Sequence, residues 1–152
     1  MSSIDQHFRV AMRRLAKIST VSLLLGAMSA AIAARAANPQ AAAEAAAATW
    51  LALVDAGKYG SSWTQAASYV RQTVAQSAWA LSVARARAVC GPLQSRHLES
   101  AYATAYLPDS PDGHYVVIHY SSRFAHKIGV TETITMVAES SGRWRVIGYY
   151  IN

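Results

Sequence analysis

The spacing of apolar residues changes in the middle of the chain. Between residues 38 and 91, apolar side chains recur every three or four positions, which is the repeat of one helix face. After Leu93 they alternate with polar side chains, as they do in a strand. The pattern therefore predicts helices followed by an antiparallel sheet, which is the α+β fold class.

Two helices are predicted first. Asn38 and Pro39 supply an N-cap and a first helical position for an alanine-rich helix that ends before Gly57. A capping-box pattern at Ser62 begins a second helix, which keeps an apolar stripe as far as Val74.

A third helix is predicted between Ser77, which can cap its start, and Gly91, which ends it. Arg85 and Arg87 fall outside its apolar stripe and are expected to face solvent. Cys90 is the only cysteine, so no disulfide can form within the chain, and we expect it to be a small buried apolar residue. The stripe consists of Trp79, Val83, Ala86 and Cys90.

Four strands follow, with turn-forming residues between them. Short connections make consecutive strands antiparallel neighbours, so we expect a meander with the three helices packed on one face. Opposing like faces pairs Phe124 with Val130, which puts Ser122 opposite Glu132. A three-residue turn before the last strand puts Glu132 opposite Tyr150. The strands are predicted over residues 96–107, 114–124, 130–139 and 143–151.

The two faces of this sheet differ in composition. The even-numbered face is the more apolar and is expected to lie under the helices; it gathers Leu98, Tyr102, Val116, Ile118, Tyr120, Phe124, Val130, Ile134, Met136, Trp144, Val146 and Tyr150. The odd-numbered face is mixed, and its apolar members are Val117, Val137, Ile147, Tyr149 and Ile151. Because exposed apolar clusters mark interaction sites, these five residues predict an interface for a weak homodimer or an envelope protein, with a solvated monomer as the alternative.

The N-terminus has the pattern of a secretory signal peptide. A basic segment precedes an uncharged, mostly apolar run over residues 18–32, and Ala34, Arg35 and Ala36 fit a small-x-small cleavage site. The run is shorter than the roughly 20 apolar residues of a membrane-spanning helix. We therefore expect a cleavable leader over residues 1–36, a single domain over 37–152, a periplasmic or secreted location, and no stable membrane anchor after cleavage.

Removing the leader changes the charge of the protein. The chain has 14 Lys and Arg against 8 Asp and Glu, but five of the basic residues and one acidic residue lie in the leader, so nine and seven remain. Without a basic cluster, nucleic-acid binding is not expected. The five histidines have no metal-ligand spacing, and no phosphate-binding or nucleophile motif occurs, so neither a metal nor another cofactor is expected.

Glu132 is the most informative candidate. It lies between apolar residues on the helix-facing side, where a carboxylate needs partners, and Ser122, Tyr150 and Arg96 are the candidates. A structural ion pair and a catalytic or ligand-binding carboxylate are both open. Asp55 ends the first helix, where the helix dipole disfavours an acid, so Lys58 or Arg96 should compensate it. Together these residues form a polar cluster that is either structural or ligand-binding.

A set of short motifs resembles the family called domain of unknown function 4019, which consists of small exported bacterial proteins. The motifs are Trp50-Leu51, Asp55 to Tyr59, Ser62-Trp63, Trp79, Arg96, Pro111 to Tyr115, Glu132-Thr133, Gly142 to Arg145 and Gly148-Tyr149. The resemblance implies no activity, because that family has none assigned.

At the level of fold, helices before a curved sheet are similar to the cystatin-like and nuclear transport factor 2-like cone. Enzymes of that cone carry an Asp base or an Asp/His pair with a tyrosine in the pocket. Here Glu132 faces inward on the predicted register, without such a pair. We therefore expect a non-enzymatic exported module that binds a small ligand or an envelope protein. The alternative is a pocket enzyme in which Glu132 and an inward tyrosine such as Tyr150 transfer a proton; it requires that the four tryptophans leave space for a substrate.

Overall fold

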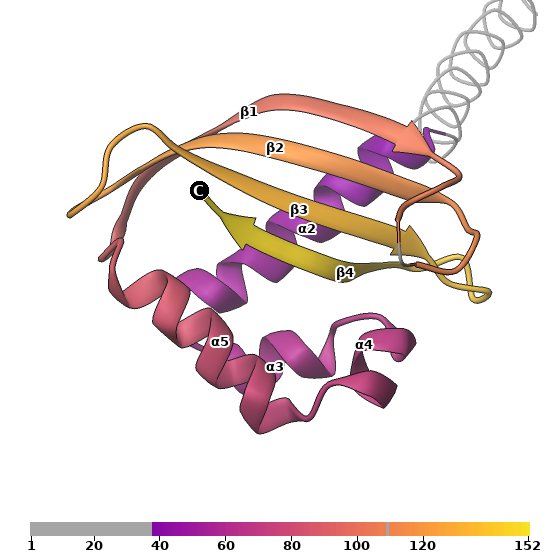
Figure 1. Cartoon of the computed structure of the whole chain (residues 1–152). Helices are drawn as coiled ribbons and strands as arrows, with labels where there is room; N and C mark the ends of the chain where they lie inside the picture. Colours follow the sequence, from indigo (N-terminus) through magenta and orange to yellow (C-terminus); the bar gives the residue numbers. More distant parts are fainter. Residues whose placement is uncertain (1–37, 109) are drawn as a thin grey trace, which may run out of the picture. The chain divides into compact units, whose positions relative to one another are not determined.

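Helices precede strands in the computed structural model, which describes residues 38–108 and 110–152 (Figure 1). This order confirms the α+β class, and Pro39–Asn152 forms one unit. The predicted leader lies outside the described residues. None of the described helices is long and apolar enough to cross a membrane. With the labels of Figure 1, the elements are α2 (Pro39–Asp55), α3 (Tyr59–Thr64), α4 (Ser68–Thr73), α5 (Gln76–Ala88), β1 (Leu93–Thr104), β2 (Tyr115–Phe124), β3 (Val130–Ala138) and β4 (Trp144–Ile151).

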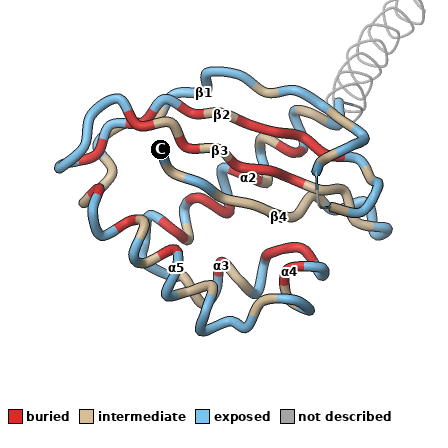
Figure 2. The backbone as a smooth tube through the Cα atoms, viewed as in Figure 1, coloured by how far each residue is buried: buried red, intermediate tan, exposed pale blue. Residues whose placement is uncertain are grey.

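Helix α2 covers one face of the sheet and passes behind the strands in Figure 1. Its buried side begins with Ala43 and Ala47, whose small side chains let the helix approach the strands closely, and continues with Trp50, Leu51 and Val54. The inward residues of β2 and β3 lie opposite this side of α2. Figure 2 shows that these two central strands are buried along much of their length.

The second predicted helix is divided into α3 and α4. Between them Ala66 pairs with Val146 of β4, and the Ala67 amide donates to the Val146 carbonyl at 2.8 Å. This short bridge satisfies backbone groups at the edge of β4, which a continuous helix could not do. Helices α3 and α4 therefore lie beside the β4 edge and do not extend the layer formed by α2 (Figure 1).

The sheet is an antiparallel meander of order β1-β2-β3-β4, as predicted. Its β2–β3 register differs by two residues from the prediction, since Ser122 faces Val130 and Tyr120 faces Glu132. The Phe124 amide bonds to the Lys127 carbonyl at 2.8 Å, so the strands stop pairing before the turn. A shift of two residues preserves the faces of both strands.

Two of the three register shifts in the described strands change the predicted faces. A register shift between Thr135 and Met136 leaves Ile147 of β4 without a partner, so Tyr149 and Ile151 turn to the helix side and Tyr150 turns outward. The expected positions of these three residues were wrong.

A second shift, at Glu99 of β1, turns Tyr102 outward as well, and Ala101 takes its place against the core. Leu98 precedes this bulge but is also exposed, because β1 is an edge strand. The inward position predicted for Tyr102 was therefore wrong, whereas Leu98 keeps the predicted face opposite Tyr120 but is not covered by the helices. A single extra residue reverses the alternation of every residue that follows it.

The five-residue apolar interface does not exist as an exposed patch. Tyr149 and Ile151 lie on the inner side, Val117 is only 5 % exposed, and Val137 and Ile147 pack against the apolar cluster around α4. The weak homodimer or envelope-protein partner itself stays a prediction.

Candidate functional site

Glu132 lies at the centre of a buried ionic cluster and is fully inaccessible to solvent. Its Oε2 accepts hydrogen bonds from Ser122 Oγ at 2.5 Å and Arg96 Nε at 2.6 Å. Its Oε1 accepts from Tyr149 Oη at 2.6 Å, Arg96 Nη2 at 3.0 Å and Arg87 Nη1 at 3.3 Å. Both carboxylate oxygens are therefore fully hydrogen-bonded.

Asp55 extends the cluster toward the surface. Arg96 binds it with two nitrogens, at 2.7 Å to Oδ2 and 3.0 Å to Oδ1, and Arg87 Nη2 lies 2.9 Å from Oδ1. Two arginines thus alternate with two carboxylates, so the cluster is electrically balanced. Asp55 ends α2, and the arginines supply the compensating charge that this position needs.

Four of the five predicted cluster residues come together: Asp55, Arg96, Ser122 and Glu132. Lys58 does not belong to the cluster, because it is exposed and takes part in none of the ion pairs of the described residues.

Tyr149 occupies the place expected for Tyr150, as a consequence of the β4 bulge. Arg87 was wrongly assigned to solvent: it is buried, and its guanidinium carbon lies 4.5 Å from the centre of the Phe124 ring. The spacing of Arg87 four residues after Val83 is the signal that could have placed it on the inner face.

The surroundings keep the donors of this cluster protonated. Burial raises the pKa of Tyr149, and the neighbouring Glu132 carboxylate raises it further, so the phenol remains a hydrogen-bond donor. Burial acts to lower the pKa of Arg96, but hydrogen bonds with Asp55 and Glu132 outweigh it and the net shift is upward. Both groups are thus fixed in their donating forms.

Aromatic side chains close the space beside the cluster. The ring of Trp50 lies 5.2 Å from that of Tyr149 and 6.3 Å from that of Trp79, both in edge-on geometry. The indole of Trp50 donates to the Ser62 carbonyl at 2.9 Å, and that of Trp79 donates to Ser62 Oγ at 3.0 Å. A general base needs a lone pair that a substrate can reach, and Glu132 offers none here.

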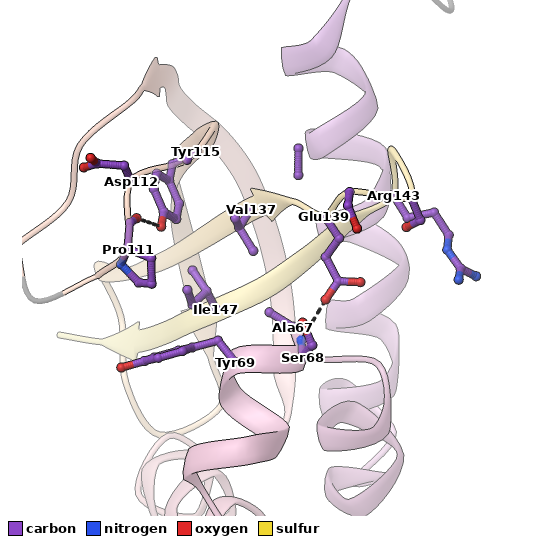
Figure 3. A pocket seen from close by; sticks show the side chains of 14 residues that line it. Ala67, Ser68, Tyr69, Pro111, Asp112, Tyr115, Val137, Glu139, Arg143 and Ile147 are labelled. Carbon is purple, nitrogen blue, oxygen red and sulfur yellow. Dashed lines mark hydrogen bonds between the residues drawn. The ribbon is translucent and has the colours of Figure 1, made fainter.

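The surface carries a separate pocket of about 360 Å³, which does not include the ionic cluster (Figure 3). Val137 and Ile147 form part of its lining, and Tyr69 of α4 and Tyr115 of β2 lie on either side of them. Arg143 also borders the pocket, but its side chain points away from it in Figure 3.

Glu139 connects this pocket to α4. Its carboxylate accepts a hydrogen bond from the Ser68 amide at 2.7 Å, and this bond is the main reason why the pKa of Glu139 is lowered. Opposite, the Tyr115 hydroxyl donates to the Pro111 carbonyl. The pocket therefore combines apolar side chains with an ionised carboxylate and the hydroxyls of Ser68, Ser140 and Ser141.

Among the described residues, no group of three or more His, Cys, Asp or Glu is placed to hold a metal ion. Cys90 is buried beside Phe124 and Val130, as expected.

Residues 46–149 match the family model described as "Protein of unknown function (DUF4019)". The chain belongs to this family. The matched region contains Asp55, Arg87, Arg96 and Glu132, so the whole ionic cluster lies within it. No curated protein matches the chain. No solved structure matches it either, and the resemblance to the nuclear transport factor 2-like cone stays a prediction.

Proposed function

We propose that the protein is an exported, non-enzymatic binding module whose ionic cluster holds the fold together and whose surface pocket takes a small ligand or a side chain of an envelope protein. The observation that carries this proposal is the saturation of Glu132 by Ser122, Tyr149 and two arginines. A carboxylate that is held this way positions secondary structure and has no free lone pair for proton transfer.

The pocket of Figure 3 supports the binding role. Its volume of about 360 Å³ lies within the range of small-molecule sites, and such sites usually combine apolar side chains with a few polar groups. Tyr69 is 44 % exposed beside it, so this ring can contact a bound molecule. The proposed export rests on the leader pattern of residues 1–36 and on the family of small exported proteins that the motifs resemble.

Native mass spectrometry of the full chain, expressed in a bacterium and isolated from the periplasm, tests the proposal. We expect a mature mass that begins at Ala37 or close to it, together with an added mass from a retained ligand or partner. Tyr69→Ala should lose the added mass, whereas Tyr106→Ala should keep it because that exposed tyrosine does not line the pocket.

Two results would contradict the proposal. Retention of residues 1–36 in a cytoplasmic product would refute export. A bare mature mass for the parent protein, or an added mass that survives Tyr69→Ala, would refute binding in this pocket.

A further inference from the structure

A row of polar and aromatic side chains crosses all four strands on the sheet face away from α2. The register pairs Ser100 with His119, His119 with Thr133, and Thr133 with Tyr150, which places these residues side by side on one face. Tyr102 joins the row from β1, because its ring is stacked on the His119 ring at 6.2 Å and 29°. His119 is held in place by a contact of 3.0 Å between its Nδ1 and Thr133 Oγ1.

The two tyrosines of the row are open to solvent. Tyr102 is 52 % exposed and Tyr150 is 65 % exposed, although each stands in a regular strand. Neighbouring strands are about 4.8 Å apart, so the outer strands that carry them are separated by roughly 14 Å. Two aromatic rings thus stand at the ends of a short polar track.

A hollow of about 180 Å³ continues the track beside Tyr150. Ser110 and the largely buried Thr135 border it. Gly148 borders it too, and a Cβ atom at this position would lie only 3.4 Å from the Tyr150 ring, so the ring leans over bare backbone. The rest of the lining is mixed, because Leu107, Pro108 and Ile147 lie beside these polar groups.

The charges of this surface restrict its ligand. Among the residues that the structure describes, neither the row nor the lining of the hollow contains Asp, Glu, Lys or Arg. A nucleic acid or another polyanion would need basic residues, and a stable protein partner would need an apolar centre. Uncharged hydroxyls between aromatic rings instead complement a neutral ligand that has many hydroxyls of its own and apolar C–H faces.

We infer that this row, with its hollow, binds a neutral glycan chain. The negative face of a tyrosine ring attracts the weakly positive C–H groups of a sugar ring, so one sugar stacks on Tyr150 and a second stacks on Tyr102. The hydroxyls of Ser100 and Thr133 can each donate and accept hydrogen bonds with sugar hydroxyls between the two rings. The inference rests on the proposed export, which brings the protein to envelope polysaccharides.

Isothermal titration of the mature protein with two neutral hexasaccharides, chitohexaose and cellohexaose, tests this inference. We expect binding of at least one of them, and a loss of about fivefold or more in affinity for Tyr102→Ala and for Tyr150→Ala. Tyr150→Leu keeps an apolar side chain but removes the π face, so it should weaken binding as much as Tyr150→Ala does. Tyr106→Ala is the matched control and should bind as tightly as the parent, because this exposed tyrosine belongs neither to the row nor to the lining of the hollow.

The inference is overturned if neither hexasaccharide binds at millimolar concentration, if Tyr150→Leu binds like the parent, or if Tyr106→Ala weakens binding as strongly as the two row variants. Near-ultraviolet circular dichroism checks that each variant is folded. We expect each variant to fold, because the substituted side chains are exposed. The two proposals fail separately: the native mass of Tyr69→Ala decides the pocket of Figure 3, and the titration of the row variants decides the glycan surface.

Discussion

At the scale of single residues, the interior contains charged side chains, whose burial is unfavourable. Removing Glu132 and Arg87 from water costs several kcal/mol for each ion, and the attraction within one ion pair does not always offset this desolvation free energy. Here each Glu132 oxygen accepts at least two hydrogen bonds, and Asp55 balances the second arginine. The cluster is stable as a set, so removing one member should be costly.

Glu132→Ala should therefore be more damaging than Asp55→Ala. The first change leaves two arginines and a buried phenol without their common acceptor, and we expect a loss of about 3–5 kcal/mol in the free energy of unfolding. The side chain of Asp55 is 25 % exposed, so water can replace part of its contacts and the loss should be smaller. Urea unfolding of both variants measures the difference, and the opposite order would show that the centre of the cluster has been misidentified.

Because of Tyr149, we expect the free energy of unfolding to decrease at alkaline pH. Its pKa is raised in the folded protein by burial and by Glu132, and it returns to about 10 on unfolding. Above that pH the unfolded chain releases a proton that the folded chain retains, so this contribution is complete below pH 10 and declines as the pH rises.

Tyr149→Phe isolates this effect. The variant lacks the hydrogen bond to Glu132 and should be about 1–3 kcal/mol less stable near pH 8. Because it has no phenol to titrate, the gap from the parent should narrow toward about pH 11. Urea unfolding of both proteins across this range gives the gap, and a constant gap would mean that Tyr149 is not buried beside the carboxylate.

At the scale of elements, bulges and turns decide which side chains reach the core. The bulge at Ile147 turns Tyr149 inward and Tyr150 outward. The turn between α5 and β1 is the second such feature. Gly91 adopts φ +73° in this turn, and the His126 amide donates a hydrogen bond to the Cys90 carbonyl at 2.9 Å.

The bulge can be tested with adjacent substitutions in β4. Tyr149→Asp places a second carboxylate beside Glu132 in the interior and should prevent folding or greatly destabilise the protein. Tyr150→Asp changes an exposed side chain and should alter the free energy of unfolding by less than about 0.5 kcal/mol. Circular dichroism and urea unfolding distinguish the two, and a reversed result would place the bulge elsewhere in the strand.

Gly91 and Gly57 form a matched pair for the turn. Both have positive φ, so replacement by Ala should cost about 1–2 kcal/mol at either position. At Gly91 the added Cβ would also lie 2.8 Å from His126 Nδ1, whereas at Gly57 nothing lies within 4 Å. Thermal unfolding should show the larger loss for Gly91→Ala, and His126→Ala should remove the excess; equal losses at the two glycines would show that the imidazole moves away freely.

At the scale of the whole molecule, stability should be uneven. Strands β2 and β3 pair on both sides and contribute much of the buried core, whereas β1 has a free edge and α4 has a single buried residue, Val70. Figure 2 shows the same contrast between the central strands and β1.

Hydrogen exchange of the folded protein should follow this order. Amides of β2 and β3 should exchange only through global unfolding, and those of α4 should exchange first. The Ala67 amide is the expected exception near α4, because it pairs with β4. Uniform protection across the described elements would contradict this distribution of stability.

The sequence by itself determined the class and order of the elements, because helical and strand periodicities differ and turn residues separate the runs. It also identified Glu132, Asp55, Arg96 and Ser122 as a polar set, since a carboxylate between apolar residues requires partners. These are local signals that any chain of this pattern would carry.

Only the tertiary structure decided which residues complete that set. The bulge at Ile147 exchanged Tyr150 for Tyr149, and the pairing of Ala66 with β4 divided the second helix. Arg87 entered the core because its partners, Asp55 and Glu132, come from elements distant in the chain. A bulge changes the local free energy of the strand only slightly, and burial of a single arginine is unfavourable. Both features become favourable only through the contacts that form when the surrounding elements pack.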